Sequence, residues 1–214
     1  MNLKFAAFAL VATLLSSTAS ADGIVEGSAD AGKDKSITCA ACHGADGNSV
    51  NPAWPSIAGQ HASYIVKQLQ AFKRGERADP LMTGQAMMLS DEDMNNLAVY
   101  YSEQRPASRA VADASLVSKG EALYRGGDQE SSASACIACH GPTGKGNPAA
   151  SYPSIRGQYA VYTAKQLHDY ASGTRKSDGV TRVMRDVAAR LSDDDIKAVS
   201  AYVQGLRGGV TAGE

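Results

Sequence analysis

Two copies of one short motif constrain this chain more than any other feature. C-A-A-C-H at residues 39–43 recurs as C-I-A-C-H at residues 136–140, and the two copies use all four cysteines. C-x-x-C-H is the attachment site of a c-type haem, because two thiols fix the porphyrin edge and the adjacent histidine reaches the iron. A repeated match is hard to attribute to chance. The sequence therefore predicts two covalently bound haem c groups, attached through Cys39, Cys42, Cys136 and Cys139, with His43 and His140 each ligating one iron.

Disulfide bonding is the alternative use of these four cysteines. An exported chain meets an oxidising compartment, where thiols can pair. Bridges within each motif would close very small loops, and no disulfide pairing explains why a histidine follows each pair. We therefore favour haem attachment.

The N-terminus has the pattern of a secretory signal peptide. Lys4 gives a positive start, Phe5 to Leu15 form an apolar run, and Ala19-Ser20-Ala21 supply a small-residue cleavage site. An uncleaved anchor is the alternative, but the apolar run is shorter than the roughly 20 residues that span a bilayer. We expect an exported protein whose signal peptide, residues 1–21, is removed near Ala21.

The rest of the chain is an internal repeat, which predicts two domains. The offset between the copies grows only from 97 residues at the motif histidines to 102 residues near the C-terminus. The shared segments after the motif are H-G-x-x-G, P-S-I-x-G-Q, K-Q-L and L-S-D. A segment with a proline, small residues and mixed charges separates the copies and is typical of a linker. We expect domains at 22–102 and 116–214, joined by a linker at 103–115.

Helical signals dominate both copies, and strand alternation is absent. Apolar residues between Tyr64 and Arg74 recur on one helix face. Ser90 with Asp93, and Ser192 with Asp195, resemble capping boxes before two further helices. Weaker helices are expected near 31–37 and 116–124. Units of about 90 residues are small for a core of side chains alone, so a buried haem would supply the missing apolar bulk. The predicted fold class is all-α.

The second iron ligand decides between electron transfer and catalysis, because a methionine closes the iron whereas an open iron binds small molecules. Met184 is the only methionine of the second copy and lies seven residues before Leu191. Met82 lies seven residues before the equivalent Leu89, so the repeat selects Met82 and Met184 together, in loops. Met87 is the rival in the first copy. We expect Met87, Met88 and Met94 to fill core space.

The other histidines and two prolines have weaker signals. His61 and His168 have no matching histidine in the other copy, so we expect surface roles rather than a bis-histidine iron. Pro55 and Pro153 follow the motif histidines by 12 and 13 residues, and their carbonyl groups could accept a hydrogen bond from the ligating imidazoles.

Together these motifs resemble the dihaem cytochrome c4 family over essentially the whole mature chain. The resemblance implies two tandem class I cytochrome c domains related by a pseudo-twofold axis. It assigns Cys39, Cys42, His43 and Met82 to one haem, and their equivalents Cys136, Cys139, His140 and Met184 to the other. It also implies a periplasmic electron carrier, soluble or loosely held at the inner membrane. The donor would be a cytochrome bc complex or another quinol-derived source, and the acceptor a haem-copper terminal oxidase.

Two classes of function remain to be compared. An electron carrier needs two closed irons and no chemical substrate. A dihaem enzyme, such as a peroxidase or a sulfur-compound dehydrogenase, needs one open or unusually ligated iron, which the matched methionines argue against. The formal net charge of −1 and the lack of a basic stripe do not indicate nucleic acid as a partner. We therefore expect an electron-transfer protein and no enzyme.

Overall fold

The structure is a computed structural model that describes residues 25–207. The expected signal peptide lies outside the described residues. Every regular element in the described range is a helix, and the only β-pairing consists of three isolated bridges. The all-α prediction is therefore confirmed for this range.

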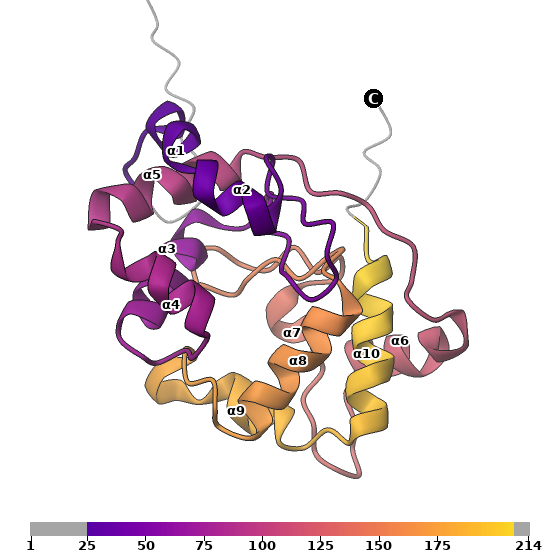
Figure 1. Cartoon of the computed structure of the whole chain (residues 1–214). Helices are drawn as coiled ribbons and strands as arrows, with labels where there is room; N and C mark the ends of the chain where they lie inside the picture. The colour runs from indigo at the N-terminus through magenta and orange to yellow at the C-terminus, as the bar shows by residue number, and fades with distance from the viewer. Residues whose placement is uncertain (1–24, 208–214) are drawn as a thin grey trace, which may run out of the picture.

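The first half of the chain forms five helices. They are α1 (Ala29–Lys35), α2 (Ile37–His43), α3 (Ala62–Lys73), α4 (Pro80–Met87) and α5 (Asp91–Ser102). Both α1 and α3 pack against α5, and α4 packs against α3. These helices form the upper left of the molecule in Figure 1.

The second half repeats this arrangement around α10. Its elements are η1 (Ala114–Leu116), α6 (Val117–Gly126), α7 (Ile137–His140), α8 (Ala160–Ala171), η2 (Gly179–Thr181), α9 (Val183–Ala188) and α10 (Asp193–Gly205). Here α6 and α8 pack against α10, and α9 packs against α8. Every helix–helix contact in the described part of the chain joins two helices of the same half. The halves meet through loops and through side chains that cross the junction.

Both expected capping boxes are present. The Ser90 hydroxyl accepts a hydrogen bond from the Asp93 amide, and the Asp93 carboxylate accepts one from the Ser90 amide. Ser192 and Asp195 repeat the arrangement at the start of α10. Each box satisfies two amide groups that a helix N-terminus leaves unpaired, which fixes where α5 and α10 begin.

Two glycines allow the closest helix crossings. A Cβ atom on Gly32 of α1 would lie 2.1 Å from the Asn96 carbonyl oxygen of α5, and one on Gly120 of α6 would lie 2.2 Å from the Ala198 carbonyl oxygen of α10. Any side chain would push these helices apart. The two crossings are equivalent, so each half uses a glycine to bring an early helix, α1 or α6, onto its last helix.

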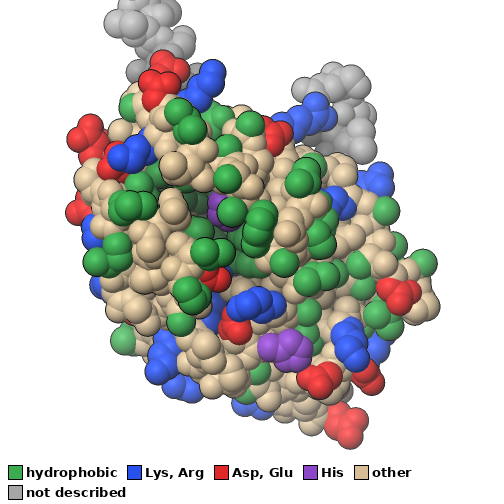
Figure 2. Space-filling view, viewed as in Figure 1, with side chains coloured by type: hydrophobic (Ala, Val, Ile, Leu, Met, Phe, Trp, Pro, Cys, Tyr) green, Lys and Arg blue, Asp and Glu red, His purple; other side chains and the backbone are tan. Residues whose placement is uncertain are grey.

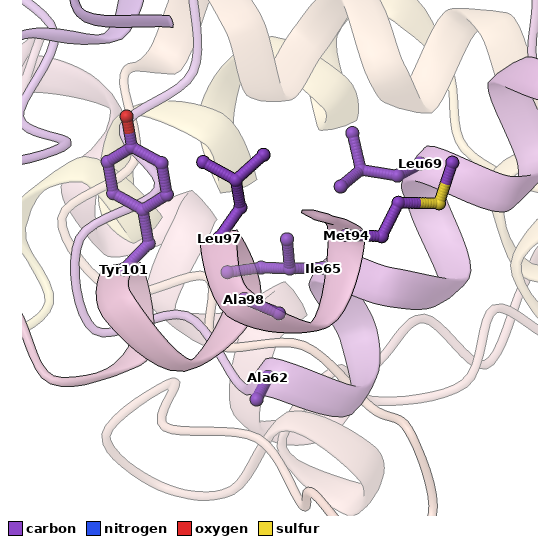
Figure 3. Packing of buried hydrophobic residues seen from close by; sticks show 7 residues of the cluster. All are labelled: Ala62, Ile65, Leu69, Met94, Leu97, Ala98 and Tyr101. Carbon is purple, nitrogen blue, oxygen red and sulfur yellow. The ribbon is translucent and has the colours of Figure 1, made fainter. Parts of the chain in front are cut away.

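The buried cores are small and lie between the helices of each half. In the first half they consist of side chains from α3 and α5: Ala62, Ile65, Leu69, Met94, Leu97, Ala98 and Tyr101. Figure 3 shows Leu97 and Tyr101 on the same side of α5, while Met94 extends toward Leu69. The corresponding cluster of the second half consists of Tyr124, Val199, Tyr202 and Val203. Each core is bordered by partly buried apolar residues that include one motif cysteine, Cys39 or Cys136.

The segment expected to be a linker passes over the molecule from α5 to α6 (Figure 1). Arg109 of this segment forms hydrogen bonds to both halves. Its guanidinium donates to the Ser49 carbonyl and the Ser56 hydroxyl of the first half, and to the Gly157 carbonyl of the second. It also lies 4.0 Å from the Tyr159 ring centre. The segment is thus held against both halves.

Within residues 25–207, none of the helices combines the length and the apolar character needed to cross a membrane.

Candidate haem sites

The first candidate site is built on α2. Cys39, Cys42 and His43 are spaced i, i+3 and i+4 along the helix, which places them on one face. His43 is the last helical residue and is buried, and Gly44 follows with a φ of 81°. That left-handed conformation suits glycine and turns the chain away directly after the histidine. In the second half, His140 ends α7 and Gly141 has a φ of 74°.

Each motif histidine is oriented by a proline carbonyl, as expected from the sequence. His43 Nδ1 lies 2.8 Å from the Pro55 carbonyl oxygen, and His140 Nδ1 lies 3.0 Å from that of Pro153. A carbonyl can only accept, so Nδ1 carries the proton and Nε2 keeps its lone pair. Burial lowers the pKa of both imidazoles, which favours the neutral form that a metal requires.

All four motif cysteines are free thiols, so the alternative disulfide pairing is not present. Burial raises the pKa of Cys39, and raises that of Cys136 to about 11. Each of these two sulfurs packs against the apolar core of its half. The thiols therefore lie where a porphyrin edge would meet apolar walls.

The methionines differ from the expectation in two respects. Met82 and Met184 lie in short helices, α4 and α9, and not in loops. Asp79 explains the first helix, because its carboxylate accepts a hydrogen bond from the Met82 amide, and Pro80 occupies the first turn. The prediction that Met87 and Met88 fill core space is wrong, since they are 58% and 68% exposed, whereas Met94 is fully buried as expected.

The two expected methionine ligands have different surroundings. Met82 is half-buried and packs against the core of the first half together with Cys39. Its rival Met87 points largely into solvent. Met184 is also half-buried, but it does not pack against the buried core of the second half.

The two remaining histidines are engaged elsewhere. His61 was expected at the surface but is buried, and its Nε2 lies 2.8 Å from the Lys145 carbonyl oxygen of the other half. Tyr159, its counterpart, likewise donates from its hydroxyl to the Ser49 carbonyl across the junction, at 3.0 Å. His168 is half exposed and lies 3.8 Å from Asp193.

The structure fits a large apolar cofactor with a few polar edges. Figure 2 shows one face hollowed beside the first-half helices, with hydrophobic side chains around the hollow and a histidine within it. In the second half, the buried Nε–H of Arg156 has no hydrogen-bond partner among the described residues. Oriented imidazoles, free thiols and an unsatisfied buried donor together match what a covalently bound haem would use.

The two P-S-I-x-G-Q loops bind each other reciprocally. The Gln60 side chain donates to the Ser154 carbonyl at 2.8 Å and accepts from the Ser154 amide at 2.9 Å. The Gln158 side chain makes the same pair of bonds to Ser56, at 2.9 and 3.0 Å. The exchange places the two halves about a pseudo-twofold axis.

Comparison with known proteins identifies the family. The cytochrome c family model matches residues 29–103 and 117–207, one segment in each half. Cytochrome c4 of Pseudomonas aeruginosa is 47% identical over 84% of this chain and 89% of its own length. The chain belongs to the cytochrome c4 family. It is therefore an electron-transfer cytochrome with two haem c groups.

The solved and curated relatives agree with this cytochrome c4 assignment. The crystal structure of reduced cytochrome c4 from Pseudomonas stutzeri superposes with a TM-score of 0.82 at 45% identity, covering 85% of this chain and all of its own. A more distant relative, from Stutzerimonas stutzeri, is named thiosulfate dehydrogenase electron acceptor. It is 38% identical over 78% of this chain and 77% of its own length.

One cluster of polar side chains in this cytochrome c4 family member was not predicted from the sequence. Arg77 and Arg175 lie in the same place of the repeat, as G-E-R and G-T-R, and both are buried where the halves meet. The matched G-x-R at an offset of 98 residues was a signal available in the sequence. Tyr64 and Tyr162 belong to the same cluster.

Proposed function

We propose that this protein carries single electrons from a respiratory donor, a cytochrome bc complex or another quinol-derived source, to a haem-copper terminal oxidase. It would act in the periplasm after removal of its signal peptide near Ala21. The proposal is supported by membership of the cytochrome c4 family and by the export pattern of the first 21 residues.

The observation that carries this proposal is the likeness of the two sites. Each half has a buried imidazole, oriented by a proline carbonyl, and a methionine on the short helix that precedes its last helix. The proposed ligand pairs are His43 with Met82 and His140 with Met184, and the proposed attachment residues are the four motif cysteines. A haem held by these residues would supply one-electron Fe(III)/Fe(II) chemistry.

Irons ligated by a histidine and a methionine would leave no position for a chemical substrate, so we propose no catalytic residue. The protein side chains then have three tasks: they anchor the porphyrins, orient the imidazoles, and keep water from most of each haem. Electrons would enter and leave at exposed haem edges through small, transient docking surfaces. A peroxidase or a dehydrogenase would instead need one iron without its methionine.

A sulfur-oxidising dehydrogenase is the second candidate donor. One relative is named as the electron acceptor of thiosulfate dehydrogenase. A protein of that kind accepts electrons from an enzyme and is not itself the enzyme. This donor would use the same two haem sites, so the choice between donors concerns docking and not the irons.

A haem count with absorption spectra tests the closed sites. We expect two haems per chain and no change in the reduced spectrum when carbon monoxide is added. A carbon monoxide shift in half or all of the haem would show an open iron and would revive the enzyme alternative.

Stopped-flow oxidation and reduction test the partners. The reduced protein is mixed with a purified haem-copper oxidase, and the oxidised protein with a cytochrome bc complex or with thiosulfate dehydrogenase and thiosulfate. We expect second-order electron transfer with the bc complex and with the oxidase, slowed by salt. Transfer only from thiosulfate dehydrogenase would replace the proposed donor, and failure with the oxidase would remove the proposed acceptor. Membrane and soluble fractions of cells would show whether the protein associates peripherally with the membrane.

A further inference from the structure

The second copy of the repeat has four extra residues directly before its methionine helix. Met82 follows Arg77 by five positions, whereas Met184 follows the equivalent Arg175 by nine. The extra residues lie in the loop that leads into α9. The chain therefore enters α9 by a longer path than it enters α4, and the second half needs a different means of holding its methionine helix.

A buried ion pair between Asp178 and Arg185 closes this longer loop. Arg185 Nε donates to Asp178 Oδ1 at 2.8 Å, and the Arg185 amide donates to Asp178 Oδ2 at 3.0 Å. Arg185 Nη2 also donates to the Gly179 carbonyl, and the Thr181 hydroxyl donates to the Asp178 carbonyl at 2.9 Å. The paired side chains are only 5% and 12% exposed. Separating a pair this deeply buried is costly, because each charge would lose its partner without gaining water.

The Asp178 carboxylate also replaces the missing cap of α9. The residue before this helix is Arg182, which has a φ of 53° and makes no capping hydrogen bond from its side chain. A left-handed conformation is strained in a residue with a side chain, so other contacts must hold it. Asp178 binds the amide of Arg185, the third residue of α9. In α4, Asp79 directly before the helix binds the amide of its third residue, Met82.

The two methionines differ in what else holds them. Their helices α4 and α9 pack against α3 and α8 respectively. Met82 in addition packs against the buried core of its half, whereas Met184 does not. Met184 directly precedes Arg185, so the ion pair fixes the backbone beside it. In the first copy Thr83 stands at the position of Arg185 and cannot form an ion pair.

We propose that Asp178 and Arg185 are positioning residues that hold Met184 at the second haem iron, and that the first iron does not depend on such a pair. The inference rests on the proposed pairing of His140 with Met184. Without the ion pair, the backbone at Arg185 would be free to move and Met184 would leave the iron, which would open a position for an added ligand.

Proton NMR of the reduced dihaem protein tests this role, because the porphyrin ring current shifts the methyl signal of each ligated methionine strongly upfield. We expect two such signals in the wild type. D178N and R185Q should each lose or weaken one signal and keep the other, and carbon monoxide should bind to as much as half of the haem. Two unchanged signals in both variants would overturn the proposal.

D186N is the matched control for these variants. Asp186 lies in the same helix, but its ion pair with Arg182 is at the surface, with an N–O distance of 3.5 Å and both side chains 58% exposed. Surface pairs of this kind contribute little. D186N should therefore keep both methionine signals and bind no carbon monoxide.

M184A separates the positioning role from the ligand assignment. We expect M184A to lose the same signal that D178N and R185Q lose. If M184A loses one signal while D178N and R185Q keep both, the positioning role fails and the ligand stands. If M184A keeps both signals, the proposed ligand pair and the positioning role fail together.

A milder variant decides the matter if the charge variants do not assemble with haem. T181V removes the exposed hydroxyl bond within the loop and keeps both charges. Cyanide binding to the oxidised protein is limited by departure of the methionine, so we expect binding to half of the haem to become several-fold faster. T174V, which removes another exposed threonine hydroxyl, should bind cyanide as the wild type does. An unchanged rate in T181V would then overturn the proposal.

Discussion

One backbone carbonyl oxygen determines which ring nitrogen of each motif histidine carries the proton and which can bind a metal. Because the Pro55 and Pro153 carbonyls fix the proton on Nδ1, Nε2 faces the other way as a ready ligand. The motif and its repeat correctly predicted the contacts of the two histidines with these prolines, while iron ligation by the histidines and haem attachment through the cysteines stay predictions. They did not predict that Met87 and Met88 are exposed, because a methionine in a sequence is equally compatible with a core, a surface or a ligand position.

The proposed first-site ligand can be tested by one substitution. Replacing Met82 with alanine removes the proposed thioether and should open the first iron, so that about half of the reduced haem binds carbon monoxide. The measurement is the reduced absorption spectrum with and without carbon monoxide. Met87→Ala is the matched control and should give no response, because Met87 lies largely in solvent. The reverse result would transfer the role to Met87.

At the scale of elements, local pattern predicted the long helices well because their start signals are short-range. The structure has α3 at Ala62–Lys73 and both capping boxes where they were expected. The segments that hold Met82 and Met184 were expected to be loops, but they form α4 and α9. These helices are too short to give a periodic hydrophobic pattern in the sequence. The glycine crossings were not predicted either, because a close approach depends on a partner some 60 or more residues away.

The glycine at the α6–α10 crossing gives a prediction about stability. Gly120→Ala should lower the free energy of unfolding by about 1–3 kcal/mol, because the new Cβ atom would collide with the Ala198 carbonyl. Urea titration of the haem-loaded protein measures the change. Gly126→Ala, in the same helix with nothing within 4 Å of its Cβ position, should cause no loss. Equal losses in the two variants would contradict the packing argument.

The cap of α10 predicts a dependence of stability on pH. Lys119 and Ser192 lower the pKa of Asp195 in the folded protein, so the folded state favours the charged carboxylate. Its contribution is present above the unfolded pKa of about 3.9 and is lost as pH falls through the lower folded value. Asp195→Asn should cost about 1 kcal/mol at pH 7 and progressively less below about pH 4.

Urea titrations at several pH values measure this difference. Asp194→Asn is the control, since that carboxylate is 81% exposed and only loosely paired with Lys197 at 3.7 Å. It should change stability little at any pH. A cost for Asp195→Asn that did not vary with pH would mean that the cap acts without its charge.

At the scale of the whole molecule, the halves are joined by polar side chains and not by packed helices. The repeat predicted two similar units, but not which surfaces would meet, because hydrophobic periodicity marks cores and has no equivalent for a hydrogen-bonded junction. His61 shows the limit. It looked like a surface residue since its partner, the Lys145 carbonyl, lies 84 positions along the chain.

The reciprocal glutamines give a prediction at this scale. Gln60→Ala with Gln158→Ala removes six hydrogen bonds, four of them across the junction, and leaves the Ser56 and Ser154 backbone groups without their partners. Each substitution should cost about 1–3 kcal/mol. Differential scanning calorimetry should then resolve two thermal transitions in place of one. Gln129→Ala, an exposed glutamine, should leave one transition. A single unshifted transition in the double variant would show that the junction does not couple the halves.

Because each loop binds an equivalent loop, the contact does not depend on the two partners being different. Two separate copies of such a half could in principle meet through the same exchange, as subunits of a symmetric dimer do. Fusing them in one gene keeps the copies together at a high local concentration. It also frees each copy to diverge, so histidine could come to stand opposite tyrosine at 61 and 159, and alanine opposite arginine at 58 and 156. The fusion thus allows two redox centres to acquire different properties while remaining permanently paired.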